Sequence, residues 1–414
     1  MHDVREMRWL VALLTLNAYL TTTAVLGQVS TGTDNNAKVR AACDAEFERD
    51  FNISISAAVR KAVQPPLGDT FERSQLRPGV CEAVLSIISD KLYVSRNSTR
   101  SVSGGNVHLR HKEFLESMMR NIQHTKDELG VTLPNVEFNF QTMDNPTCRY
   151  PESHSPAAPP RDPVAAVVHH SFCAPQLCNG TFLLPVSYNQ EMQALELTAD
   201  MDQQAAKIPW AKRKDLAFWR GHNKGVPKEL AYFAWKDKVM PRAKAVQMAR
   251  KSKNMDVQFG VVPWKKFMSH KYVLSFAGNT YSSSFKHELR SGGCVIRQEE
   301  RSYEWFEHFL EPWVHYVPVE WTLSDLSKKI AWARENEARA REIATAGQKR
   351  SIELFSRRKM ACYTFVALHT LHDMMGYKLD SPGDDVMPVT QVCESKGAKR
   401  NICVRAKKDS LIYE

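Results

Sequence analysis

The chain has 414 residues, 43% of them hydrophobic and 25% charged, a length and balance that predict two or three folded domains and exclude general disorder. Lysine and arginine outnumber aspartate and glutamate by 56 to 46, and this excess is spread along the sequence. A diffuse positive charge without an aromatic-basic repeat or zinc knuckle favours anionic small molecules or surfaces and argues against nucleic acid as a partner.

The N-terminus carries a long uncharged run. Residues 9–27 follow the charged start MHDVREMR and end in a small-residue pattern, which predicts a signal peptide over 1–27 that is cleaved near Gly27. The run is nearly long enough to cross a bilayer, so an uncleaved type II anchor is the alternative. Both readings place the rest of the chain in the secretory lumen, in the endoplasmic reticulum or Golgi, or outside the cell. Residues 28–39 are polar and predict a short stem.

Sequons and cysteines agree with that location. Three matches to the N-glycosylation pattern are present, at Asn52, Asn97 and Asn179. Nine cysteines suit an oxidising compartment and allow up to four disulfides, with Cys173–Cys178 and Cys393–Cys403 close enough for local bridges.

The N-terminal half predicts a helix followed by strands. Residues 108–130 place apolar side chains on one side at helical spacing and close on Gly130. In residues 136–140 apolar and polar residues alternate as in a strand that runs into the loop TMDNP. The proline-rich residues 153–163 predict a loop, and residues 164–170 a buried strand.

The C-terminal half repeats a strand, loop and helix pattern. Strands are predicted at 217–219, 257–262, 272–278, 294–298 and 315–319, and helices at 231–250, 285–293 and within 324–355. This alternation is typical of a doubly wound parallel sheet, in which ligands bind beyond the carboxyl ends of the strands. The segments AFWRGHNKG (217–225) and GNTYSSSFK (278–286) lie at such ends.

The second segment has the composition of an anion-binding turn. Gly278 and three serines, Ser282, Ser283 and Ser284, separate an apolar strand from a basic helix start at Lys286. Unpaired amides at a helix start and the helix dipole favour phosphate there. Simple capping of the helix by serine is the alternative reading.

A longer run carries a family resemblance. Residues 271–347 resemble the core of glycosyltransferase family 90, which includes Rumi-type protein O-glucosyltransferases and fungal capsule-synthesis xylosyltransferases. The matching motifs are KY at 271–272, Gly278 with Ser282, KH at 286–287, SG at 291–292, PW at 312–313, HYVPV at 315–319, REN at 334–336 and EIA at 342–344 with Gly347.

The resemblance implies site residues. FWRGHNKG is similar to the family's FRG element, which implies that Arg220 and Gly221 lie at the nucleotide, with His222 as a further candidate. The element LPNVEFNFQTMDNP implies Asp144 as the catalytic base. The glycine and serine loop with Lys286 would then bind the diphosphate of the donor.

The chain departs from the family pattern in two places. Rumi-type members have an arginine two residues before the lysine of KH, and Ser284 occupies that position here. The chain ends in SLIYE, without a KDEL-like retention signal. The nearest acidic metal motif is Asp200 to Asp202, in a helix-like polar segment that favours a solvated face.

The resemblance therefore implies a GT-B-like α/β protein of two facing Rossmann-like domains with a C-terminal helical segment. We expect an acceptor-side domain over 40–211, a nucleotide-sugar domain over 212–385 and a tail over 386–414. The implied activity is an inverting, metal-independent transfer of glucose or xylose from a UDP-sugar to a hydroxyl of a protein or polysaccharide, with no cofactor. A glycan-binding protein without turnover, and a site for another phosphate-carrying donor such as that of a sulfotransferase, are the alternatives.

Overall fold

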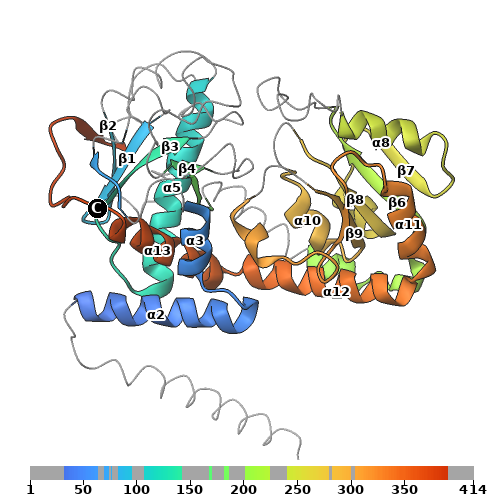
Figure 1. Ribbon diagram of the computed structural model, residues 1–414, viewed down its shortest axis with the longest axis horizontal. Coiled ribbons are helices and arrows are strands. Elements are labelled where there is room, and N and C mark those ends of the chain that lie inside the picture. Colours follow the sequence, from blue (N-terminus) through green and yellow to red (C-terminus); the bar gives the residue numbers. More distant parts are fainter. Residues whose placement is uncertain are drawn as a thin grey trace, which may run out of the picture.

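The computed structural model describes residues 32–63, 70–73, 76, 83–95, 107–141, 167–169, 181–185, 201–223, 240–278, 282–299 and 304–389 (Figure 1). Several predicted features lie outside these residues: the N-terminal segment 1–27, Asp144, the sequons at Asn97 and Asn179, and both local cysteine pairs. Within the described part of the chain, no helix has the length and apolar character needed to cross a membrane.

A first, six-stranded sheet is built from the N-terminal half and one late strand. Its order is β11-β2-β1-β3-β4-β5, with antiparallel pairs from β11 to β3 and parallel pairs from β3 to β5. The strands are β1 (Ala83–Ile88), β2 (Lys91–Ser95), β3 (Val136–Gln141), β4 (Val167–His169), β5 (Thr181–Leu183) and β11 (Val386–Pro388).

Two predicted elements of this half are confirmed. Helix α5 (Val107–Leu129) stops at Gly130, which has the left-handed φ of +62° that suits glycine. Strand β3 follows as expected, but its polar residues Glu137 and Asn139 are buried together with the apolar ones. Glu137 accepts hydrogen bonds from Arg73 at 2.9 Å, Ser86 at 2.9 Å and Tyr377 at 3.2 Å, which explains how its carboxylate is accommodated.

A second sheet of five strands is parallel throughout. Its order is β10-β9-β8-β6-β7. The strands are β6 (Lys214–Gly221), β7 (Met255–Phe259), β8 (His270–Ser275), β9 (Cys294–Gln298) and β10 (Val317–Val319). The predicted α/β class with a doubly wound parallel sheet is confirmed; the facing arrangement of two Rossmann-like domains stays a prediction.

Helices cover both faces of the second sheet. On one face, apolar residues of β6 and β8 pack with α8 (Pro241–Ala249), α11 (Leu326–Glu335) and α12 (Glu337–Leu354). On the other face, α9 (Trp264–Met268) packs through Phe267 on Phe218 and Val273, and α10 (Phe285–Arg290) packs beside Val295. Two short 3-10 helices complete this half, Trp210–Lys212 and Trp305–Phe309.

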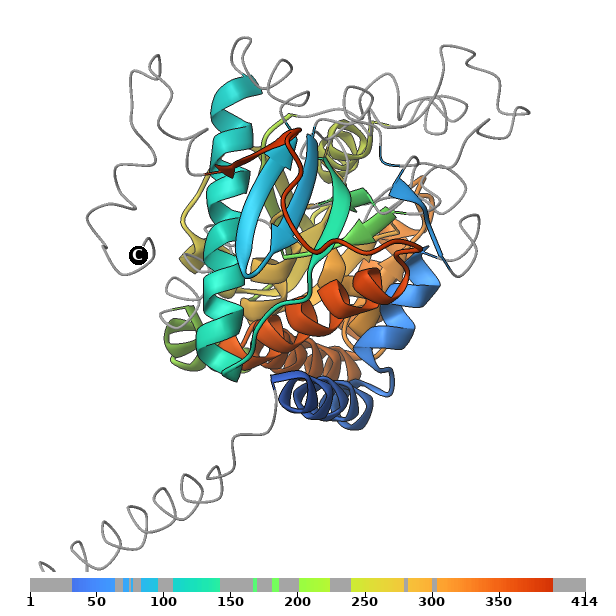
Figure 2. The same ribbon diagram turned by 90° about the vertical axis from the view of Figure 1, so that its left-hand side faces the viewer.

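The chain then returns to the first sheet. Figure 1 shows α12 leading along the lower edge of the molecule into α13 (Arg357–Asp373), which lies beside α5. Helix α13 is buried on nearly all sides, and β11 extends the first sheet, as the turned view in Figure 2 also shows. The predicted nucleotide-sugar domain of 212–385 thus contains α13, which packs on β3 and on helices of the N-terminal half. Because α13 is apolar on nearly all sides, it needs such partners and cannot lie at the surface.

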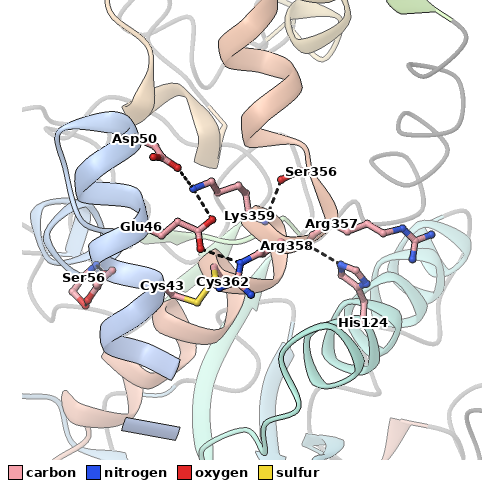
Figure 3. The surroundings of a disulfide bond; sticks show 11 residues. Cys43, Glu46, Asp50, Ser56, His124, Ser356, Arg357, Arg358, Lys359 and Cys362 are labelled. Atoms are coloured by element: carbon pink, nitrogen blue, oxygen red, sulfur yellow. Dashed lines mark hydrogen bonds and ion pairs between the residues drawn. A yellow bond between two sulfur atoms is a disulfide. The ribbon is translucent and has the colours of Figure 1, made fainter. Parts of the chain in front are cut away.

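A disulfide fastens this return. Cys43 of α2 (Gly32–Phe51) is bonded to Cys362 of α13 across 319 residues of sequence. Figure 3 shows Lys359 beside the bond, with its ammonium 2.8 Å from Glu46 and 2.5 Å from Asp50. The predicted use of disulfides is confirmed for this pair. The neighbouring helix α3 (Ile55–Val63) also packs on α13.

Candidate functional site

The second sheet has one place where its strand order reverses. Counting β6 as its first strand, the order is 2-1-3-4-5, and the reversal falls between β6 and β8, which pair in parallel. Chain connections leave opposite sides of the sheet at such a point, which opens a crevice at the carboxyl ends of the two strands. Arg220 and Gly221 end β6, His222 follows it, and the glycine and serine loop follows β8, so both predicted donor segments lie at this end of the sheet.

Arg220 is held by a neighbouring strand. Its Nη2 lies 2.6 Å from Oδ1 of Asp256 in β7, and its Nη1 donates to the carbonyls of Asp256 and Trp219 at 2.8 Å each. The guanidinium also lies 4.6 Å from the Phe218 ring centroid. The structure therefore gives Arg220 a role in joining β6 to β7, and its predicted contact with a nucleotide stays a prediction.

Gly221 and His222 continue from Arg220. A β-carbon at Gly221 would lie 2.5 Å from Cζ2 of Trp219, so no side chain fits there without moving a buried ring. The Gly221 carbonyl accepts a hydrogen bond from the amide of Gly260 at 3.0 Å. His222 is exposed just after the end of β6.

The serine loop is tied to a buried carboxyl group. Ser282 is 1% exposed, and its Oγ lies 3.1 Å from Oγ of Ser284, which in turn donates to Oε1 of Glu288 at 2.7 Å. Ser284 occupies the N-cap position of α10, but its hydroxyl accepts no helix amide. The Ser284 side chain therefore does not cap this helix. Ser283 is exposed, and Gly278 is buried at the start of the loop.

Lys286 points away from solvent. Its side chain is buried, and its Nζ lies 2.5 Å from Oε1 of Glu304, which is buried as well. The ammonium is also 6.0 Å from the ring centroids of Phe306 and Phe355. This geometry makes Lys286 an anchor of α10 against the segment after β9, and its predicted phosphate contact stays a prediction.

Arg242, which the sequence analysis did not single out, joins the two donor segments. Its Nε donates to the Ala277 carbonyl at 2.9 Å, its Nη2 to the Phe276 carbonyl at 3.2 Å, and its Nη1 to the His222 carbonyl at 3.1 Å. A signal was present in the sequence. Arg242 follows Pro241 at the first turn of α8, where the helix dipole disfavours a cation.

Gln298 supports the same loop from the other side. Its Oε1 accepts a hydrogen bond from the Ala277 amide at 3.1 Å, and its Nε2 donates to the Trp321 carbonyl at 2.6 Å. The side chain is fully buried at the end of β9. The backbone at Ala277, one residue before Gly278, is therefore held by side chains from two other elements.

The remaining candidates from the sequence are Asp144, Asn52 and Asp202. β3 ends at Gln141, and Asp144 lies beyond the described residues. Asn52 is exposed between α2 and α3, as a glycosylation site requires. Asp202, in the acidic motif weighed for metal, lies 3.6 Å from Arg290.

Comparison with protein families decides the relationship. The model of "Glycosyl transferase family 90" matches residues 81–411, most of the chain and both sheets. This chain belongs to glycosyl transferase family 90. The resemblance noted in the sequence is confirmed.

Individual relatives match this chain over shorter stretches than the family model does. Protein O-glucosyltransferase 3 of Homo sapiens is 34% identical over 102 residues, covering 25% of this chain and 20% of the relative. The Mus musculus protein of the same name is 24% identical over 292 residues, covering 64% and 53%. Protein O-glucosyltransferase 2 of Danio rerio is 24% identical over 314 residues, covering 72% and 60%. The chain thus spans less than two thirds of the length of these relatives.

Proposed function

We propose that this family 90 chain is an inverting glycosyltransferase that moves glucose from UDP-glucose to a hydroxyl of a protein in the secretory pathway. The observation that carries the proposal is the switch point, where Arg242 joins the segment after β6 to the loop after β8. The relatives are named protein O-glucosyltransferases, which supports glucose as the sugar and protein as the acceptor. UDP-xylose and a polysaccharide acceptor are the competing substrates.

The donor's leaving group determines what the crevice must do. Departure of the sugar leaves negative charge on the diphosphate, and prearranged positive charge and hydrogen-bond donors stabilise that charge. Arg242 brings a permanent charge to the start of both segments, and the exposed Ser283 and His222 lie within them. We propose that these groups bind the diphosphate without a metal ion, with Arg220 of β6 supporting the crevice through its ion pair with Asp256 of β7.

The acceptor needs a base on the other side of the donor. A hydroxyl loses its proton as it attacks, and a carboxylate within hydrogen-bond reach accelerates this step. We propose Asp144 for this role, since it follows β3 by three residues at the carboxyl end of a buried strand. One base and no covalent intermediate would give inversion, from an α-linked donor to a β-linked product.

The test combines binding with turnover. UDP should raise the melting temperature of the full-length chain, because a ligand at a hundred times its Kd adds about 2.7 kcal/mol to the free energy of unfolding. UDP-glucose and UDP-xylose, each with and without EDTA, should then be compared for UDP release with protein and polysaccharide acceptors. Asp144→Asn should bind UDP as the wild type does and release none above background.

The outcomes separate the alternatives. UDP binding without turnover on any acceptor would favour a glycan-binding protein. Binding of a different nucleotide in place of UDP would favour another phosphate-carrying donor. Loss of turnover in EDTA would contradict metal independence alone.

A further inference from the structure

Glu288 is a buried acid directly behind the serine loop. It lies in α10 with its side chain fully buried, while Ser284 and Ser283 of the loop reach the surface. Its Oε1 accepts the Ser284 hydroxyl at 2.7 Å, and Ser284 lies 3.1 Å from Ser282. The carboxyl group therefore sits at the inner end of a line of hydroxyls that leads to the loop proposed to bind diphosphate.

The groups around Glu288 neutralise it only in part. The positive charges of Arg242 in α8 and Arg297 in β9 lower the pKa of Glu288 through electrostatic attraction. Arg242 donates to three backbone carbonyls, and Arg297 forms an ion pair with Glu307. The Ser275 hydroxyl of β8 lies beside the carboxyl group, outside hydrogen-bond geometry. Oε2 has no hydrogen-bond partner in the described part of the chain.

Among the residues that the structure describes, the other elements packed on α10 offer Glu288 no counter-ion. From α12, Ser351 and Gln348 donate to backbone carbonyls of α10. In the segment after β9, Glu304 forms an ion pair with the ammonium of Lys286. In its own helix, His287 has its pKa lowered to about 3 by burial and by nearby Lys286 and Arg290, so its ring is neutral.

We propose that Glu288 is a positioning residue of the donor loop that works in its neutral form, so that a diphosphate binds together with a proton. The reason is electrostatic. A carboxylate in this buried place lacks solvation, and a diphosphate at the loop would add negative charge beside it. A neutral carboxyl group keeps the hydrogen bond from Ser284 without that repulsion, and it leaves no uncompensated charge on Oε2.

The pKa of the Glu288 carboxyl group lies near neutral pH. Burial raises the pKa of its carboxyl group to about 7, against the smaller lowering by the Ser275 and Ser284 hydroxyls. A negative ligand nearby would raise this pKa further, and linkage then requires that lower pH strengthens ligand binding. This inference rests on the proposed donor site and adds a proton to the ligands of that site.

UDP is the probe for a direct test on the full-length chain. Calorimetric titration at pH 7.5 in buffers of different ionisation enthalpy should show that the wild type takes up most of one proton per UDP bound. Glu288→Gln, which imitates the neutral acid, should take up none beyond that due to UDP itself. Between pH 6 and pH 8 the Kd of the wild type should rise roughly tenfold more than that of Glu288→Gln.

Ser284→Ala tests the positioning part separately. It removes the hydroxyl that links Glu288 to the loop and leaves the acid in place, so UDP should bind several-fold more weakly at every pH. Parallel pH profiles in wild type and Glu288→Gln, no proton uptake by the wild type, or unchanged affinity in Ser284→Ala would overturn the inference. Absence of UDP binding in folded wild type would instead overturn the proposed function on which it rests.

Discussion

Arg242 illustrates how one side chain can order two loops. Three hydrogen bonds from one guanidinium hold the carbonyls of His222, Phe276 and Ala277. An ammonium on a flexible stem cannot reproduce this fork, so exchange for lysine is not conservative here. The two loops that border the crevice should therefore lose their relative position when Arg242 is changed.

We expect Arg242→Lys to weaken UDP binding at least tenfold while the protein remains folded. Arg250→Lys, at the exposed far end of the same helix, is the matched control and should bind UDP as the wild type does. Both can be measured by calorimetric titration and by melting temperature. Equal affinity in the two variants would show that the bridge does not organise the donor site.

Glu288 should also make stability depend on pH. Its carboxyl group has a folded-state pKa of about 7 against 4.5 for the ordinary group, because burial disfavours the charge. The folded state thus binds more protons than the unfolded state between these values, and the stability of the wild type falls as pH rises through them.

Glu288→Gln has no such titration. At pH 8 it should therefore be more stable than the wild type by up to about 3 kcal/mol relative to their difference at pH 4. Chemical unfolding of both proteins at several pH values measures this difference. A difference that stays constant across the range would mean that the acid is solvated in the folded state.

At the scale of elements, the disulfide and its ion pairs fix α13 against α2. Cys43 and Cys362 are both buried, and Lys359 makes its two contacts one turn away (Figure 3). The bond closes a loop that contains all five strands of the second sheet, so it restricts the unfolded chain strongly.

We expect Cys43→Ala with Cys362→Ala to lose about 2 to 5 kcal/mol of unfolding free energy. Cys294→Ala serves as the comparison for a buried cysteine outside a disulfide, where only packing is lost. Reducing agent should lower the melting temperature of the wild type and of Cys294→Ala more than that of the double variant, in which any remaining response would come from the bridges predicted among the other cysteines. An equal response in all three proteins would contradict a stabilising role of the Cys43–Cys362 bond.

Several helices and strands were predictable from local hydrophobic spacing. The helix ending at Gly130 and the strands at 136–140 and 294–298 appear where periodicity placed them, because hydrophobic spacing depends on the element itself. The span 324–355 was expected to be helical, and it divides at Asn336 into α11 and α12. Helix α13 was not assigned to the first sheet, because an all-round apolar helix does not reveal its partner.

For the whole molecule, one apolar core reaches across both halves. The cluster that contains Phe138 of β3 and Phe365 of α13 also contains Phe285 of α10 and Val295 of β9. The N-terminal sheet and part of the second sheet therefore share buried surface, and separating them would expose large aromatic side chains.

Calorimetric unfolding should accordingly show one cooperative transition for the two sheets, despite their separate strand orders. Phe285→Ala, on the second sheet's side of this core, should lower the stability of the whole by about 3 to 5 kcal/mol. Hydrogen exchange should show equal loss of protection in β3 and β9 of this variant. Two resolved transitions, or a loss confined to β9, would mean that the halves unfold independently.

The sequence by itself determined the α/β class, the strand and loop order of the second half, and the family, since all three depend on local periodicity and contiguous motifs. It also placed Gly278, Ser282 and Arg220 at strand ends. Only the tertiary structure decided what those residues contact. Lys286 pairs with Glu304, Arg220 with Asp256, and Ser284 with Glu288. The reason is physical: charge and burial depend on neighbours distant in sequence, and periodicity carries no information about them.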